Sequence, residues 1–488
     1  MRKISYLVAL IVIACLLCNV SKAQMRNFTG SNGRIIEAEL LGFNEATQIV
    51  NIRLRDGREQ NVRLDLFAAA CQQWIKSGGQ QQGDDPFGDA DDPWGESDWE
   101  WLFDGRSLNG WEGDTNAWRV DQNEQTLVGT GRGNLFTTKQ YDNFIVQLQF
   151  RCEDRANNGL MIRVDDAARQ GASRGDFSQI MEVQIADDRI ISGPNHNGSV
   201  FNALSGPKPY TFYDRNNHLV GGWNFMEVVA DGQKITTYVN GMKVVDDTLP
   251  QDKPFSSVSN GRIGLMGMDG TTAFRYIRIK PLKAGEDWRT SKITANDAAE
   301  GFTRIFDGRT LNGWQGDQDK FRIENNMLTQ FDAPGKLESV KEYRNYVMRF
   351  EFRLTREGNN GIGFRQSGGN AAKIMIRDDS SFTDDRIPFH FHGSLDLTVP
   401  ARRGSLNPVG QWNTMEITAN GSMIRIVTND QIIVDTDIRN FHPPTNRADV
   451  PDFIYALIAG FQNKSGSIGI AGGNRQVDFR NIRVKELP

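Results

Sequence analysis

The sequence predicts an all-β protein in which two sandwich domains follow a small N-terminal barrel. Glycine is abundant, at 49 of 488 residues, and aromatic residues make up 10% of the chain. Short runs rich in Val, Ile, Phe and Thr alternate with clusters of Gly, Asn and Asp, which is typical of strands joined by turns. The two halves of the chain also share a colinear series of motifs, and a two-copy repeat with a period of about two hundred residues indicates a duplicated domain.

The first residues have the three parts of a secretory signal. A basic start precedes an apolar run over 4–18, and the small residues Ser21 and Ala23 follow it. We expect cleavage after Ala23, which makes 1–23 a signal peptide and places the protein outside the cell, in the periplasm or in the cell envelope. A lipoprotein signal ending at Cys15 is the alternative. No later stretch is apolar enough to predict a membrane span.

Residues 25–77 predict a small β domain of their own. Its short strands are expected at 35–40, 49–54 and 62–64. A hairpin turn is expected at Asp56-Gly57 and a short helix over 66–75. Strands of this number around one small core would make a barrel of SH3 size. The next segment, 78–98, holds Gly, Gln, Asp and Pro but few apolar residues, so we expect a flexible acidic linker.

The repeat divides the rest of the chain. Residues 102–111 and 305–314 are identical at eight of ten positions. Later matches keep nearly the same spacing, and they include Asn157-Asn158-Gly159 with 359–361 and Arg163 with Arg365. We therefore expect a first sandwich at 99–283, a linker at 284–299 and a second sandwich at 300–488.

Strand signals occur at matching places in both copies. Residues 144–151 and 347–353 alternate apolar and polar side chains, as half-buried strands do. Asn240-Gly241 separates two strand patterns and predicts a tight hairpin turn. Asn429-Asp430 fills the same place in the second copy, since Asn and Asp tolerate the positive φ of such turns.

Composition excludes some classes of function. The net charge is −5 and no long basic run occurs, so nucleic acid is not an expected partner. Only Cys71 and Cys152 remain after signal cleavage, and they lie in different predicted domains. A disulfide framework is therefore not expected, and the domains must be stabilised by buried apolar surface.

The order of the motifs resembles the 3-keto-disaccharide hydrolase domain family, which was long catalogued as a domain of unknown function. The matching segments are 103–111, 157–163, 181–187, 198–201, 222–224 and 274–280. The resemblance runs through 99–283 and again through 300–486, and it implies a concanavalin-like jelly-roll sandwich of the kind found in laminarinases and lectins. The N-terminal piece resembles the SLA-type homology domain, an SH3-like barrel that allows a protein partner. Planctomycete secreted proteins often join these two domain types.

The resemblance implies a reaction on sugars. The family cleaves glycosides whose sugar carries a ketone at carbon 3, which acidifies the hydrogen on carbon 2. A base removes that hydrogen, an enolate forms, the group on carbon 1 leaves, and water adds. This chemistry needs a base and a donor or cation near the ketone oxygen. It needs no redox cofactor in this step, and the resemblance leaves a divalent metal open.

The candidate site residues lie in the first copy. Glu182 is the expected base or acid, because it alternates with apolar neighbours and shares a strand face with Gln184. Arg163 is the expected stabiliser of the enolate, and Asp187 and His196 are secondary candidates. The expected substrate-binding residues are Gln184, Asn158, Trp223 and Asn224.

Four of these residues also have a structural alternative. Glu182 can lie on an ordinary solvent-facing strand, and Arg163 can be a cross-strand partner of a carboxylate. His196 can be a loop residue without a role. Trp223 can belong to the sandwich core, which is the commoner place for tryptophan.

Both copies depart from the family pattern. Met266 and Met268 replace the usual Gln and His before the last strand of the first copy. Lys373 and Met375 stand in the second copy where Glu182 and Gln184 stand in the first, and a lysine cannot take over a carboxylate's role. His390 and His392 could share a strand face, but no third ligand is evident and no metal site is expected.

The sequence therefore predicts an exported carbohydrate-active hydrolase or lyase, with its site in the first sandwich and a carbohydrate or glycoside as substrate. Two alternatives remain open. One is a lectin-like protein that binds glycans without turnover, and the other is an architectural protein of the envelope.

Overall fold

The fold is described from a computed structural model. It describes residues 25–29, 35–44, 47–54, 58–66, 75, 98–191, 193–212, 222–283, 285–291, 299–330, 334–368, 370–382, 388–439, 441 and 452–488. The chain forms two compact units, Met1–Gly95 and Glu96–Pro488. The expected signal peptide, Cys71 and nearly all of the expected linker at 78–98 lie outside the described residues.

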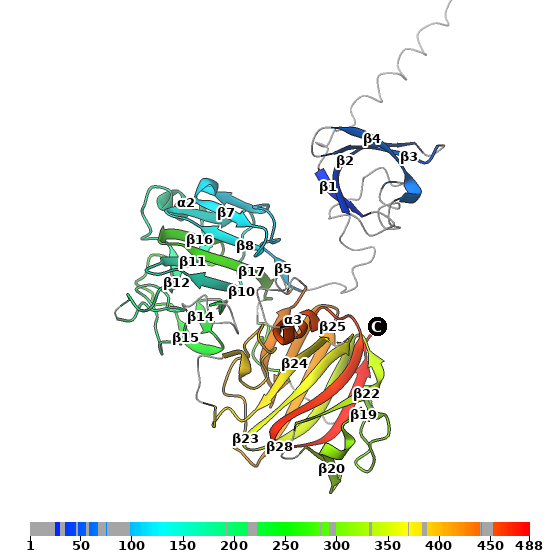
Figure 1. The fold of residues 1–488 in the computed structure, drawn as a ribbon. Coiled ribbons are helices and arrows are strands. Elements are labelled where there is room, and N and C mark those ends of the chain that lie inside the picture. The colour runs from blue at the N-terminus through cyan, green and yellow to red at the C-terminus, as the bar shows by residue number, and fades with distance from the viewer. Residues whose placement is uncertain are drawn as a thin grey trace, which may run out of the picture. The chain divides into compact units, whose positions relative to one another are not determined.

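The first unit is a four-stranded antiparallel sheet with the order β1-β2-β3-β4 (Figure 1). The strands are β1 (Met25–Thr29), β2 (Ile35–Asn44), β3 (Ile49–Leu54) and β4 (Glu59–Arg63), and the 3-10 helix η1 (Leu64–Leu66) follows. Its small core contains Ala38, Val50, Ile52, Leu64 and Ile75. The predicted strands are therefore present. The expected turn at Asp56-Gly57 and most of the expected helix over 66–75 lie outside the described residues, and the SH3-like barrel stays a prediction.

The first sandwich has two layers. Its eight-stranded sheet has the order β15-β14-β13-β10-β17-β8-β7, and β5 pairs with β17. These strands are β5 (Glu100–Trp101), β7 (Trp118–Asp121), β8 (Thr126–Gly129), β10 (Phe144–Cys152), β13 (Asn224–Asp231), β14 (Lys234–Val239), β15 (Met242–Thr248) and β17 (Thr272–Pro281). The predicted alternation over 144–151 holds, because Val146, Leu148 and Phe150 point into the core.

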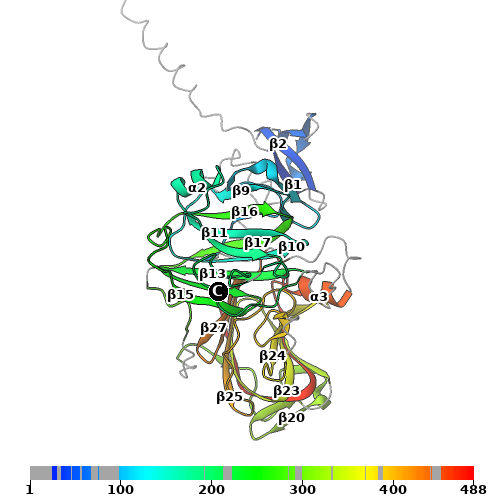
Figure 2. The ribbon, with the colours of Figure 1, turned by 90° about the vertical axis from the view of Figure 1, so that its left-hand side faces the viewer.

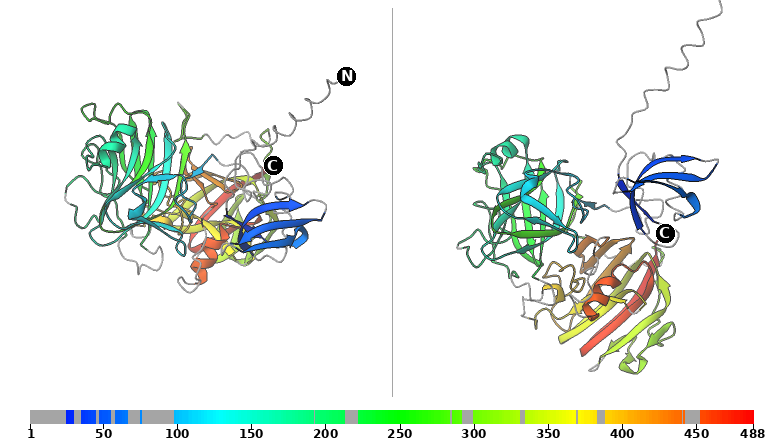
Figure 3. Two further views of the ribbon diagram at one scale, coloured as in Figure 1. Left: turned by 90° about the horizontal axis from the view of Figure 1, so that it is seen from above. Right: turned by 45° about the horizontal axis from the view of Figure 1, so that its top comes forward.

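The other layer is a five-stranded sheet with the order β12-β11-β16-β9-β6. Its strands are β6 (Trp111–Gly113), β9 (Gly133–Thr137), β11 (Asn157–Val164), β12 (Met181–Ala186) and β16 (Arg262–Asp269), and a short helix, α2 (Asp166–Ala172), follows β11. Leu160, Val183 and Ile185 pack from this sheet against Leu148 and Phe274 of the other. Figure 3 shows the two layers of this sandwich in further views.

The second sandwich repeats this plan with longer strands in an eleven-stranded sheet. Its strands are β18 (Thr303–Arg304), β19 (Trp314–Gly316), β20 (Phe321–Glu324), β21 (Met327–Gln330), β22 (Gly335–Tyr343), β23 (Tyr346–Ser367), β24 (Asn370–Arg377), β25 (Trp412–Asn420), β26 (Met423–Thr428), β27 (Gln431–Asp437) and β28 (Gly466–Glu486). β23 corresponds to β10 and β11 joined, and β28 to β16 and β17 joined, so the two layers become one sheet. A helix, α3 (Asp452–Gly460), packs beside β24 (Figure 1).

The predicted hairpin turns are confirmed. β14 and β15 pair antiparallel, with Asn240 at φ 51° and Gly241 at φ 75° between them. β26 and β27 pair in the same way around Asn429 at φ 49° and Asp430 at φ 62°. Two successive positive φ angles give a tight turn whose twist matches that of the flanking strands.

The two sandwiches meet through buried polar side chains. Glu227 Oε1 accepts a hydrogen bond from Arg402 Nε at 2.8 Å, and the Lys280 ammonium lies 3.0 Å from Asp435 Oδ2. Gln147 Nε2 donates to the carbonyl of Asp435 at 3.0 Å. Figure 2 shows β27 meeting the sheet that contains β10 and β13. The polar face of that sheet is therefore an interface rather than a solvated surface.

Two other features bear on the predictions. Cys152 is a free, buried thiol. None of the helices in the described part of the chain is long and apolar enough to cross a membrane.

Candidate functional site

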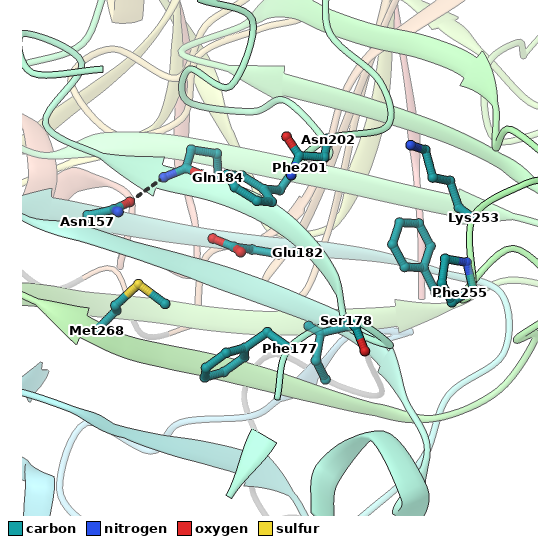
Figure 4. Close-up of a pocket in the computed structure, with 12 residues that line it drawn as sticks. Asn157, Phe177, Ser178, Glu182, Gln184, Phe201, Asn202, Lys253, Phe255 and Met268 are labelled. Carbon is teal, nitrogen blue, oxygen red and sulfur yellow. Dashed lines mark hydrogen bonds between the residues drawn. The ribbon is translucent and has the colours of Figure 1, made fainter. Parts of the chain in front are cut away.

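A cavity of about 370 Å³ lies on the side of the five-stranded sheet that faces away from the sandwich core. Its polar lining consists of Asn157, Ser178, Glu182, Gln184, Asn202 and Lys253. Its apolar lining consists of Phe177, Ile180, Phe201, Pro254, Phe255 and Met268. Figure 4 shows the Glu182 carboxylate between Gln184 and Met268.

Strand β12 places Glu182 in this cavity. Met181, Val183 and Ile185 point into the core, and Glu182 and Gln184 point to the opposite side, as the alternation predicted. The Glu182 side chain lies over Gly159 of β11, where a Cβ atom would stand 2.5 Å from Oε1. A glycine at this position therefore leaves the space that the carboxylate occupies.

The surroundings of Glu182 favour its neutral form. Burial raises the pKa of Glu182 to about 7, because a charged carboxylate loses hydration there. None of the described residues donates a hydrogen bond to the carboxylate or forms an ion pair with it. Near neutral pH this group can therefore both accept and return a proton.

Amide groups flank Glu182 on one side. Gln184 Nε2 donates to Asn157 Oδ1 at 2.7 Å, and Gln184 keeps a second amide N–H (Figure 4). Asn202 is fixed by Asn195, whose Nδ2 donates to Asn202 Oδ1 at 2.9 Å. The cavity thus offers oriented donors and acceptors of the kind that sugar hydroxyls need.

Asn158, an expected substrate-binding residue, points away from the cavity. Its Nδ2 donates to Thr272 Oγ1 at 2.6 Å, and its Oδ1 accepts from the Met268 backbone at 2.7 Å. Its neighbour Asn157 lines the cavity instead. Because β11 pairs with β12, Asn157 lies on the same face of the sheet as Glu182. The alternation of side chains along β11 puts Asn157 on the face of Gly159, so the sequence contained the information needed to choose Asn157 instead of Asn158.

Arg163 is not among the residues that line the cavity. It has a φ of 50°, which ends the alternation of β11, and its guanidinium donates to the carbonyls of Asp142 at 2.8 Å and Gly232 at 2.6 Å. Arg365 has a φ of 42° and donates in the same way to the carbonyls of Arg344 and Gly421. The two copies therefore share an arginine that ties two turns together, and the structure does not bring Arg163 to Glu182.

Asp187 and His196 are engaged elsewhere and do not line the cavity. Although burial alone raises the pKa of Asp187, hydrogen bonds from Arg189 and from the Arg155 backbone lower it overall. His196 Nε2 lies 3.0 Å from the Gly206 carbonyl in a buried loop. Both residues hold loops at one end of β12.

Trp223 and Asn224 are also outside the cavity lining. The Trp223 ring is buried, with the guanidinium carbons of Arg151 and Arg275 at 4.6 Å and 4.2 Å from its centroid. Asn224 exchanges two hydrogen bonds with the backbone of Phe212. Both expected sugar contacts are thus part of the packing of the eight-stranded sheet.

Loops supply the part of the site that sequence patterns did not indicate. Phe177 and Ser178 precede β12, Phe201 and Asn202 follow it, and Lys253 and Phe255 come from the segment after β15. Phe201 ends the 198–201 segment of the family resemblance, whereas no motif or periodicity marks the other loop residues. Met268 lines the cavity, whereas Met266 is buried beneath it against Phe136 and Met161.

The second sandwich has a lysine at the equivalent place. Lys373 lies over Gly361 as Glu182 lies over Gly159, and its ammonium is 3.1 Å from Asp396 Oδ2. His390 Nε2 lies 3.3 Å from Asp396 Oδ1, whereas His392 Nε2 lies 3.1 Å from Thr428 Oγ1. The two histidines face different partners. Within the described residues, no group of three or more His, Cys, Asp or Glu side chains could hold a metal ion.

The match to a family model agrees with the repeat. The model of the 3-keto-alpha-glucoside-1,2-lyase-like domain matches residues 98–280 and 301–485. A 3-keto-disaccharide hydrolase of Bacteroides thetaiotaomicron is 25% identical over 251 residues, which cover 43% of this chain and 85% of that protein. A crystal structure of a Parabacteroides distasonis protein is 17% identical, with a TM-score of 0.33, and covers 41% of this chain and 100% of its own. A carbohydrate-binding module of Bacillus subtilis is 12% identical, with a TM-score of 0.25, and covers 36% of this chain and 96% of its own. The family model matches most of the chain, so this protein belongs to the 3-keto-alpha-glucoside-1,2-lyase-like domain family and carries two copies of its domain.

Proposed function

We propose that the first sandwich cleaves the glycosidic bond of 3-keto-glycosides by proton abstraction and elimination, with Glu182 as the base. One observation carries this proposal. Glu182 is a half-buried carboxylate in an open cavity, and its pKa of about 7 suits proton transfer near neutral pH.

The proposed reaction uses one carboxylate twice. The Glu182 carboxylate takes the proton from carbon 2, and the electrons of the C–H bond form an enolate with the ketone at carbon 3. The enolate then collapses, the bond from carbon 1 to its oxygen breaks, and protonated Glu182 returns the proton to the departing oxygen. Water adds across the resulting double bond to give the free keto sugar. A carboxyl group whose pKa lies near the working pH serves both steps.

Amides rather than an arginine face the reacting part of the sugar. The guanidinium of Arg163 is turned to two backbone carbonyls, so we assign no contact with the enolate to it. The N–H groups of Gln184, Asn157 and Asn202 are the available donors for the ketone and hydroxyl oxygens.

The test is product formation from a panel of 3-keto-glucosides of both anomers. Turnover by the parent protein is compared with Glu182→Gln and with Glu342→Gln, which changes an exposed carboxylate on β22. Removal of a general base lowers the rate by roughly 10²–10⁴-fold, so we expect a fall of that size in Glu182→Gln alone. Equal turnover in all three proteins would overturn the assignment of Glu182.

Glycan binding without turnover is the second candidate. The observation that favours it is Met268, an apolar side chain in the cavity at a position where the family usually has a polar one. An inactive parent protein that binds glucosides, and loses that binding in Gln184→Ala, would support this candidate instead.

We further propose that the protein is exported, on the basis of the signal expected at 1–23. Mass spectrometry of the protein from its native cells tests this. An N-terminus at Gln24 would support the proposal, and an intact Met1 would contradict it.

A further inference from the structure

The cavity has two chemically different ends. Figure 4 shows Glu182, Gln184 and Asn157 together on one side and Lys253 with Phe255 on the other. The first end contains the proposed base and the side-chain amides, with Met268 beside them. The second end combines an aromatic ring and a proline with an ammonium group.

The segment that carries Lys253 is fixed to the sandwich. The Lys253 backbone N–H donates to the Pro250 carbonyl at 3.2 Å, and the Ser256 N–H donates to the Lys253 carbonyl at 3.0 Å. The Phe255 side chain is only 7% exposed and belongs to the main core of the first sandwich. The position of Lys253 at the cavity is therefore built into the fold.

The positive charge of the Lys253 ammonium is not balanced by a neighbouring carboxylate in the described part of the chain. The side chain is half-buried, and no carboxylate among the described residues forms an ion pair with it. Lys373, which stands at the Glu182 position of the second sandwich, is by contrast neutralised by Asp396 at 3.1 Å. An ammonium without a counterion favours a ligand that brings a negative charge.

The proposed reaction decides which part of a substrate reaches Lys253. Carbon 2 must lie at the Glu182 carboxylate, and the hydroxyls of the sugar ring need the amides of Gln184 and Asn157. The ring therefore occupies the first end. The group on carbon 1 then extends toward Phe255 and Lys253, where apolar surface can cover a flat ring and the ammonium can meet an anion.

We propose that Lys253 selects substrates whose leaving group is an apolar ring bearing a carboxylate. This inference rests on the proposed function for the identity of the sugar. A cavity of about 370 Å³ is near the lower end of the roughly 300–1,000 Å³ range of small-molecule sites, which suits one sugar ring and one further ring.

The test compares two matched substrates, the 3-keto-glucosides of phenol and of 4-hydroxybenzoate, in both anomers. In the parent protein, kcat/KM for the carboxylated substrate is expected to exceed that for the phenyl substrate by roughly tenfold, mainly through KM. In Lys253→Met this ratio falls to about one, and in Lys253→Arg it returns toward the parent value. The ratio also decreases as salt is raised, because added ions screen the pair.

One kinetic result would overturn the inference. If kcat falls equally for both substrates in Lys253→Met and their ratio does not change, then Lys253 acts on the sugar or on the fold and not on the leaving group. Thermal unfolding of each variant identifies a loss that comes from the fold.

A binding assay separates this inference from the proposed function. Calorimetry of the parent protein and Lys253→Met with the unoxidised phenyl and 4-carboxyphenyl glucosides requires no turnover. A carboxylate preference that depends on Lys253, in a protein that turns over nothing, would support the inference and reject the proposed function. Turnover without any such preference would do the reverse, and the absence of a preference from both assays overturns the inference.

Discussion

The carboxylate of Glu182 lies directly over Gly159 on the neighbouring strand, in space that any larger residue would fill. Strands β11 and β12 pair antiparallel, and Met161 rather than Gly159 is opposite Glu182, so the side chain leans along the strand to reach this place. In the second copy Lys373 leans over Gly361 in the same way. In both copies, the glycine of the Asn-Asn-Gly motif therefore leaves room for the side chain that lies over it.

Gly159→Ala tests this relationship. The new methyl group would force the Glu182 carboxylate to move, and a displacement of about 1 Å at a reacting group can cost roughly 100-fold in rate. We expect kcat to fall by about that factor. Gly361→Ala is the matched control, because its methyl group would meet Lys373 and leave the first sandwich unchanged. Equal losses in the two variants would show that the effect is on folding rather than on the site.

The pH dependence of the reaction follows from the state of Glu182. A base must be ionised to accept a proton, and burial raises the pKa of Glu182 to about 7. We expect log(kcat/KM) to rise with pH up to about 7 and to level off above it, when initial rates are measured from pH 5 to pH 9. A profile that is already level at pH 5 would mean that the base has an ordinary carboxyl pKa, and would contradict the raised pKa of Glu182.

The free energy of unfolding should depend on pH in the opposite direction and should fall as the pH rises. The folded protein holds a proton on Glu182 between about pH 4.5, its ordinary pKa, and about pH 7, where the unfolded chain has lost it. This stabilising contribution is complete below pH 4.5 and is lost as pH rises through 7. One pKa unit corresponds to about 1.4 kcal/mol, so Glu182→Gln should gain at most roughly 3 kcal/mol over the parent protein between pH 4.5 and pH 8. Urea unfolding measures this difference, and Glu342→Gln should show none of it.

Substitution of Arg163 or of Arg365 should destabilise the protein to the same extent. Each guanidinium is largely buried and donates to two backbone carbonyls that belong to separate turns. Hydrogen bonds from charged groups contribute about 1.5–3 kcal/mol, so Arg163→Met and Arg365→Met should each destabilise the protein by about 3 kcal/mol. If Arg163 instead stabilises the enolate, then Arg163→Met lowers kcat while Arg365→Met does not, at a temperature where both remain folded.

The residues that regular strands position could be predicted from the sequence. Alternation of Met181 to Ile185 put Glu182 and Gln184 on one face, and Asn240-Gly241 indicated its turn, because both signals are local. Counting in twos from Gly159 would also put Arg163 on this face, but its φ of 50° turns the side chain out of the series. A single sequence does not reveal where a strand departs from its regular geometry.

The loop residues of the site could not be predicted from strand alternation. Phe201, Lys253 and Phe255 reach the cavity from loops, and only the packing of those loops brings them to Glu182. The burial of Trp223 and Asn224 likewise depends on partners that are distant in the sequence, such as Arg275. Residue type suggested sugar contacts for both, but tertiary packing uses them in the sheet.

The interface between the two sandwiches contains a buried ion pair whose contribution to stability can be measured. Glu227 accepts from Arg402 and, through its second oxygen, from Gln147 at 2.7 Å, and all three side chains are buried. Arg402→Met leaves the Glu227 carboxylate buried without its cation, and removal of one partner from such a pair costs about 3–5 kcal/mol. Urea unfolding of Arg402→Met should show this loss. The double variant Glu227→Gln with Arg402→Met removes both charges and should recover most of the loss, because the cost comes mainly from the unpaired charge. If the double variant is as unstable as the single one, the interface depends instead on the apolar contacts and backbone hydrogen bonds of Arg402, which donates to the Ile432 carbonyl at 2.9 Å.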